Sequence, residues 1–170
     1  MRLGISSKGT IYILCFVLVA VFAMAGAADA QVLCNQGTSF HIQDEARVAD
    51  AGNVYFGWGL DFDLNSANST WIHTPIPSVL FENTQILAVV FYTGSSDAWV
   101  DRIDVWNGDT RVKIIDGLHL SGDQAYVIDL GTDIPAVSLS ISARVNAGVE
   151  QDPVGGHRFV FYTACAEFHP

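Results

Sequence analysis

The chain has 170 residues, half of them hydrophobic, and its formal net charge is −10. A surface this acidic repels phosphate backbones and anionic lipid headgroups, so nucleic acid is excluded as a favoured partner.

The first thirty residues have the three parts of a secretory signal peptide. Arg2 and Lys8 precede an apolar run that begins at Ile11, and Ala28-Asp29-Ala30 is a cleavage site of the small-x-small kind. A retained membrane anchor is the alternative, because the apolar run is about long enough to span a bilayer. We expect a signal peptide over 1–30 and a secreted or cell-surface protein that does not enter the membrane after cleavage.

Cleavage would leave residues 31–170 with seventeen acids and six bases, a formal charge of about −11. This length suits one domain with a hydrophobic core. Cys34 and Cys165 lie near its two ends. An even pair of cysteines in an exported protein indicates a disulfide, here between the first and last strands. Two separate buried thiols are the alternative.

After residue 30 the hydrophobic pattern has a period of two, which is typical of half-buried β-strands. Residues 54–60 alternate in this way, which predicts that Trp58 lies in the core. Residues 86–93 and 158–168 are apolar on both faces, which favours central strands. Residues 138–146 alternate between serine or other polar side chains and apolar ones.

Turn signals separate these runs, for example Gly94 to Asp97, Asn107-Gly108 and Ser121-Gly122-Asp123. About eight or nine short strands at this spacing predict an all-β fold, an antiparallel β-sandwich of the jelly-roll kind.

Residues 102–114 predict a β-hairpin with Asn107-Gly108 as its two-residue loop. In this register Asp104 pairs with Arg111 across the strands. The apolar residues would share the core-facing side, and these are Ile103, Val105, Val112 and Ile114. The charged residues and Trp106 would share the outer side.

Four segments together resemble a family of small prokaryotic β-sandwich proteins of unknown function. They are "STWIHTPIPSV" (69–79), "WVDRIDVWNGDTRV" (99–112), "DGLHLSGD" (116–123) and "RFVFYTACAEF" (158–168). The resemblance implies the sandwich fold and brings no catalytic residues. Cys165 stands where the family's pattern has a small residue, so the disulfide would be an adaptation of this exported chain.

Motifs for metal or nucleotide chemistry are weak. The histidines are scattered singly, which gives little support for a transition metal. "DFDLNS" places Asp61, Asp63 and Asn65 at alternate positions, and this set is a candidate calcium site because hard cations prefer oxygen ligands. A solvated turn is the alternative, and apart from calcium we expect no cofactor. Asn68 begins a glycosylation sequon in the same segment.

Trp106 is the most informative residue for function, because the hairpin register places it among charges. An outward tryptophan beside carboxylates and arginine is suited to stack a sugar ring and to bind its hydroxyls. The predicted ligand-binding residues are Trp106, Asp104, Asp109 and Arg111. The alternative is that Trp106 only covers a neighbouring strand.

We therefore interpret the protein as an exported, non-catalytic binding or structural module, whose partner is a carbohydrate or another surface polymer. Two alternatives stay open. One is an envelope or matrix protein that assembles with itself through sheet edges. The other is an extracellular glycan hydrolase whose carboxylates come from the Asp-rich loops.

Overall fold

The computed structural model of the chain describes residues 30–49, 54–79, 82–150 and 156–170. The signal peptide expected over 1–30 therefore lies outside the described residues, apart from Ala30. In the described part of the chain, no helix has the length and apolar character needed to cross a membrane.

The described residues form eleven strands and two short 3-10 turns. In chain order they are β1 (Gln31–Gln36), η1 (Gly37–Ser39), β2 (His41–Ile42), η2 (Glu45–Arg47), β3 (Val54–Phe56), β4 (Gly59–Asp63), β5 (Ser69–Pro75), β6 (Asn83–Thr93), β7 (Ala98–Asn107), β8 (Thr110–Ile115), β9 (Asp123–Pro135), β10 (Leu139–Ala147) and β11 (Arg158–Phe168).

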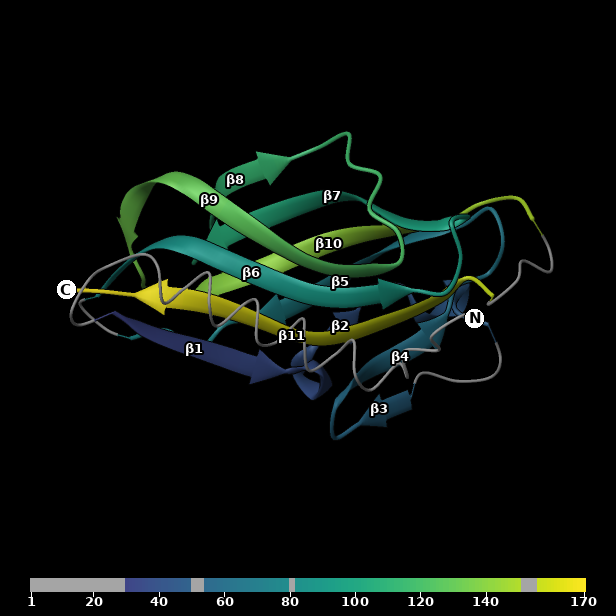
Figure 1. Cartoon of the computed structure of the whole chain (residues 1–170), viewed down its shortest axis with the longest axis horizontal. Coiled ribbons are helices and arrows are strands. Elements are labelled where there is room, and N and C mark those ends of the chain that lie inside the picture. Colours follow the sequence, from purple (N-terminus) through teal and green to yellow (C-terminus); the bar gives the residue numbers. More distant parts are fainter. Residues whose placement is uncertain (1–29, 50–53, 80–81, 151–155) are drawn as a thin grey trace, which may run out of the picture.

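The strands form two antiparallel sheets. The first sheet has the order β3-β4-β11-β6-β9, with β1 pairing with β11, and the second has the order β2-β5-β10-β7-β8. Figure 1 shows β8 along one edge of the sandwich and β1 and β3 along the opposite edge. From β4 to β11 the order is β4-β11-β6-β9 over β5-β10-β7-β8, which is the strand arrangement of a jelly roll. The predicted all-β sandwich is confirmed, with more strands than the eight or nine expected.

The core lies between the sheets and follows from the alternation of each strand. Phenylalanines of the first sheet contact each other there, with Phe91 5.4 Å from Phe161 between ring centroids and Phe62 5.5 Å from Phe159. The second sheet adds mainly aliphatic side chains, among them Ile72, Ile103, Val105, Leu139 and Ile141. The other face of the second sheet is thereby left to polar and aromatic residues.

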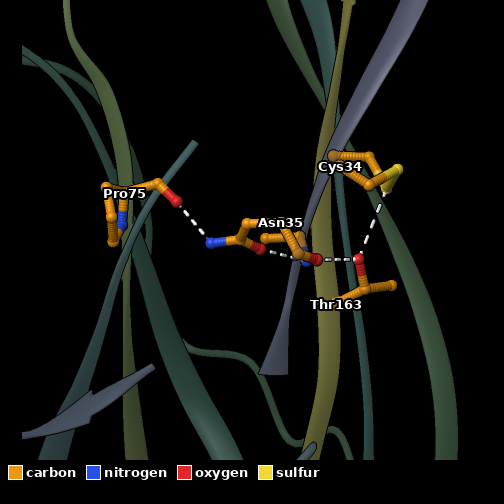
Figure 2. Close-up of a disulfide and its surroundings, with 6 residues drawn as sticks. Cys34, Asn35, Pro75 and Thr163 are labelled. Carbon is orange, nitrogen blue, oxygen red and sulfur yellow. Dashed lines mark hydrogen bonds between the residues drawn. A yellow bond between two sulfur atoms is a disulfide. The ribbon is translucent and has the colours of Figure 1, made fainter. Parts of the chain in front are cut away.

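The first and last strands are joined as the sequence predicts. Cys34 and Cys165 form a disulfide between directly paired positions of β1 and β11. Beside it, the buried side chain of Asn35 donates to Thr74 and to the carbonyl of Pro75 on β5, and accepts from the Ala164 amide. Figure 2 shows Asn35 reaching toward Pro75, while the Thr163 hydroxyl lies between the Asn35 carbonyl and the disulfide. Asn35 thus links the two sheets.

The prediction that Trp58 lies in the core is wrong. Residues 57 and 58 form the turn of a hairpin between β3 and β4, and Trp58 is 49% exposed. Its ring stacks on Phe56, with the centroids 4.8 Å apart. The alternation of residues 54–60 breaks at this turn. Gly59 follows it at a place where a Cβ would lie 2.8 Å from Phe161 O, so a side chain does not fit there.

The predicted register of the 102–114 hairpin is also wrong, by one residue at the loop. Asn107 pairs with Thr110, so Gly108 and Asp109 form the loop. Gly108 has φ +64°, and a positive-φ glycine at the first loop position is typical of a type II′ turn. Asn107 stays in the strand because its side chain is engaged elsewhere: it donates to Pro135 O and accepts from the amides of Val137 and Ser138.

A β-bulge in β8 changes which of its residues face the core. The register shifts between Val105 and Trp106, so Val105 pairs with Lys113 and Ile103 with Ile115. Ile103 and Val105 are fully buried, as predicted. Val112 packs against the core, but Ile115 takes the place expected for Ile114, which is 47% exposed.

Candidate functional site

The candidate site lies on the outer face of the second sheet. On β5, Thr70, Ile72 and Thr74 are buried, so Trp71 and His73 project outward between them. On β7, Ile103 and Val105 are buried in the core, and Asp104 between them belongs to the outer face. The outer residues of four neighbouring strands meet here: Trp71 and His73 from β5, Ser142 and Arg144 from β10, Arg102, Asp104 and Trp106 from β7, and Arg111 from β8.

A β-bulge in β7 increases the charge on this face. Arg144 pairs with Arg102 and the next residue of β10 pairs with Val100, so Asp101 is the extra residue of the bulge. Asp101 and Arg102 both take part in ion pairs with residues of the outer face. Bulges often redirect side chains beside binding sites, and this one places two consecutive charged residues together.

Asp104 is the buried acceptor at the centre of the site. Only 3% of the residue is exposed. Its carboxylate accepts from Arg102 Nε at 2.8 Å and Nη2 at 3.0 Å, and from Arg111 Nη1 at 3.2 Å. A buried carboxylate must be paired in this way, because an unpaired one would cost several kcal/mol. The predicted contact between Asp104 and Arg111 is confirmed despite the different register.

A second ion-pair group lies next to Asp104. Arg144 donates through Nε and Nη2 to the two oxygens of Asp101, at 2.8 and 2.7 Å. Asp116 lies 3.7 Å from Arg102 and 3.6 Å from Arg144 and so bridges the two groups. Hydrogen bonds to Asp104 and Asp101 raise the pKa of Arg102 and of Arg144, respectively. Both arginines therefore remain charged and are held in fixed orientations.

Two half-buried tryptophans accompany these charges. The guanidinium carbons of Arg102 and Arg144 lie 5.6 and 5.7 Å from the ring centroid of Trp71. Arg111 lies 5.5 Å from the ring centroid of Trp106. These distances are typical of cation–π contacts, which orient both partners.

His73 connects this face to the segment that follows β2. Its Nδ1 lies 2.8 Å from the Ser142 hydroxyl and its Nε2 lies 3.4 Å from Gln43 Oε1. Burial lowers the pKa of His73, and the nearby His41 lowers it further. The imidazole is therefore neutral at pH 7.

The surface is hollowed at this place by a pocket of about 220 Å³. Trp71, Trp106 and the Asp104 ion pairs line it, together with His73. An adjoining pocket of about 240 Å³ shares Trp71 and Gln43 with the first and extends to Asp44, Arg47, Ser69 and Thr70. The first pocket contains elements that suit a polar ring: flat apolar surfaces and donors held in place by Asp104.

Three of the four predicted ligand-binding residues, Asp104, Trp106 and Arg111, line the first pocket. Asp109 is instead exposed in the hairpin loop, where it accepts from Thr110. Sequence reasoning missed Trp71, His73 and Arg102. The alternation of buried and outward residues in "STWIHTP" is the signal that would have placed Trp71 and His73 on the outer face.

The candidate calcium residues lie on the other sheet. Asp61 and Asp63 belong to β4, and Asn65 follows it. Asp61 is engaged through both oxygens by Arg158. The described residues contain no group of three or more Asp, Glu, His or Cys side chains that could hold a metal ion together. The calcium site stays a prediction, and so does glycosylation of Asn68, whose side chain donates to Ser66 O.

Ser66, His157 and Asp97 also lie in a row, like the members of a hydrolase triad. His157 Nε2 is 3.2 Å from Asp97, and His157 Nδ1 is 3.5 Å from the Ser66 hydroxyl. The hydroxyl, however, donates to Glu150 O at 2.9 Å. A serine nucleophile must give its proton to the histidine. This row is therefore suited to hold the surrounding loops together.

No protein-family model and no curated protein sequence matches this chain. Similar solved structures include a family 29 carbohydrate-binding module, 11% identical over 82% of this chain and 90% of its own, with a TM-score of 0.40. A mutant of the CBM29-2 module complexed with mannohexaose is 11% identical over 82% and 93%, with a TM-score of 0.40. The CBM36-1 domain of a multidomain xylanase from the hindgut metagenome of Trinervitermes trinervoides is 11% identical over 84% and 98%, with a TM-score of 0.41.

Proposed function

We propose that the protein is an exported, non-catalytic carbohydrate-binding module whose ligand lies on the outer face of β5, β10, β7 and β8. The observation that carries the proposal is the first pocket, where Trp71 and Trp106 lie beside the ion pairs of Asp104. Sugars present apolar C–H faces and hydroxyl edges, and this pocket offers partners for both. The signal-like N-terminal sequence and the disulfide support export.

Binding is a better match to the pocket than hydrolysis. Among the described residues that line it, Asp104 is the sole carboxylate, and two guanidiniums donate to it. Glycoside hydrolysis requires a pair of carboxyl groups, one of which carries a proton to the leaving group. A nearly fully buried carboxylate that accepts hydrogen bonds from two arginines is not suited to donate a proton to a leaving group.

Assembly through sheet edges is less well supported. β9 is a long edge strand of 13 residues. Asp129 and Asp133 lie along it with Gly131, and Pro135 ends it. Charges, glycine and proline at an edge oppose pairing with another chain.

The test compares two tryptophan variants. We expect Trp106→Ala to abolish binding to neutral polysaccharides in affinity electrophoresis, because the sugar face loses the indole ring that it contacts. Trp58→Ala is the matched control, since Trp58 is also partly exposed but lies in the turn between β3 and β4 of the first sheet. It should bind like the unmodified protein.

Thermal unfolding of both variants separates binding from scaffold effects. If Trp106 serves the ligand, its removal should barely change the melting temperature. If Trp106 is mainly scaffold, Trp106→Ala should cost about 3 kcal/mol or more of unfolding free energy, as for other large-to-small core changes. A large loss of stability, or retention of binding by Trp106→Ala, would remove the basis of the proposal.

A further inference from the structure

The second pocket continues the first pocket across Trp71. Both pockets are lined by Trp71 and Gln43, so the two hollows adjoin on the same face. The first extends from Trp71 toward Trp106 and Arg111, and the second extends from Trp71 toward Asp44 and Arg47. The indole of Trp71 therefore stands between two neighbouring hollows.

Each pocket carries its own arginine–aspartate pair. In the first pocket the pair is Arg102 with Asp104. In the second, Arg47 Nε lies 2.6 Å from Asp44, and Arg47 also donates to Ser69 O. In each pair the aspartate holds the guanidinium in place, so that its remaining N–H groups can donate to the hydroxyls of a sugar. The same pattern of partners is thus repeated along the face.

We infer that the ligand is a neutral polysaccharide held along its chain, with successive sugar residues in the two pockets and Trp71 between them. This inference rests on the proposed function and specifies its ligand class. The pockets of about 220 and 240 Å³ are each smaller than the roughly 300–1,000 Å³ of sites that enclose drug-sized ligands. Each one therefore suits a single sugar ring.

The ends of the two pockets favour binding to the interior of a polysaccharide over binding to the end of one. Arg47 lines the far side of the second pocket and has a side chain that is 47% exposed. Arg111 lines the first pocket on the hairpin side and has a side chain that is 40% exposed. Because the side chains at both ends are partly exposed, neither end of the groove is closed and a polymer can continue past it.

The charges favour a neutral polymer. The ion pairs of this face balance in charge once the neighbours of the pockets are counted: four arginines (Arg47, Arg102, Arg111 and Arg144) are matched by four aspartates (Asp44, Asp101, Asp104 and Asp116), so the groove offers hydrogen bonds without an excess of positive charge. The chain as a whole has a formal charge of −10, which repels uronic-acid polymers.

The test uses Arg47→Ala, which changes the second pocket only. Soluble mannan, mixed-linkage β-glucan and xylan are screened first, with polygalacturonate as the anionic probe. Oligosaccharides of two to six residues, made from the polymer that binds best, are then titrated by calorimetry. Arg158→Ala is the matched control, because Arg158 is 45% exposed and pairs with Asp61 on the first sheet.

We expect the hexasaccharide to bind more tightly than the disaccharide. Arg47→Ala should weaken hexasaccharide binding by roughly ten- to a hundredfold, as for loss of one hydrogen bond to a charged group. Disaccharide binding and the Arg158→Ala control should be unchanged.

The inference is overturned, with the proposed function intact, if two- and six-residue ligands bind equally and Arg47→Ala has no effect. Binding to polygalacturonate in preference to the neutral polymers overturns it as well. If no polysaccharide binds at all, the proposed function itself fails.

Discussion

His73 makes the stability of the protein depend on pH. Burial and the nearby His41 lower its pKa below the usual value of 6.5. The unfolded chain therefore binds a proton more readily than the folded chain as the pH falls below about 6.5. We expect the free energy of unfolding to decrease from pH 7 toward pH 5, with His73 contributing to the loss.

Thermal unfolding at several pH values between 5 and 7 measures this effect. His73→Gln keeps a polar side chain but does not titrate, so its melting temperature should change less over this range. Equal pH dependence in the two proteins would show that the folded and unfolded chains bind the His73 proton alike.

Asn35 lies next to the disulfide, and we expect its substitution to lower the free energy of unfolding strongly. Asn35→Ala would leave the Ala164 amide and the Thr74 hydroxyl, which are both buried, without Asn35 as their partner. Each buried polar group left unpaired costs about 1–3 kcal/mol, so we expect a loss of roughly 2–4 kcal/mol in unfolding free energy.

Urea unfolding measures this loss, with Gln31→Ala as the control. Gln31 lies on the same strand, but its amide donates to Glu82 at the surface, and its removal should change stability by less than about 0.5 kcal/mol. Similar midpoints for the two variants would mean that the Asn35 bridge contributes little.

At the scale of strands, sequence reasoning succeeded where the alternation was uninterrupted. Ile103 and Val105 were placed in the core correctly because β7 alternates strictly through them. It failed at Gly57-Trp58 and at Asn107, where a turn or a distant hydrogen bond decided the register. The Asn107 side chain bonds to residues 28 to 31 positions away, which no local pattern can show.

The attachment of β1 to β11 can be tested directly, because the disulfide between these two strands can be removed. The two cysteines are separated by 131 positions, and closing so long a loop should stabilise the domain by about 2–5 kcal/mol. We expect the Cys34→Ser/Cys165→Ser double variant to fold and to unfold at a lower denaturant concentration.

The unmodified protein, reduced with dithiothreitol, should match the double variant in denaturant unfolding. An unchanged midpoint in both samples would show that the bridge adds no stability.

At the scale of the whole molecule, the candidate site could be predicted only in part. Asp104, Trp106 and Arg111 come from one hairpin, and local reasoning brought them together. Trp71 and Arg47 come from segments well before that hairpin, and Arg144 comes from one well after it. The jelly-roll order places β10 between β5 and β7, and this order depends on long-range pairing that a single sequence does not reveal.

The disulfide also determines how the molecule responds to mechanical tension. Because it joins directly paired positions of β1 and β11, a pull between the segments outside the two cysteines passes through one covalent bond. The strands that carry the pocket residues lie between the cysteines in sequence and would bear none of that load. Tension of this kind would leave the outer face of β5, β10, β7 and β8 in place.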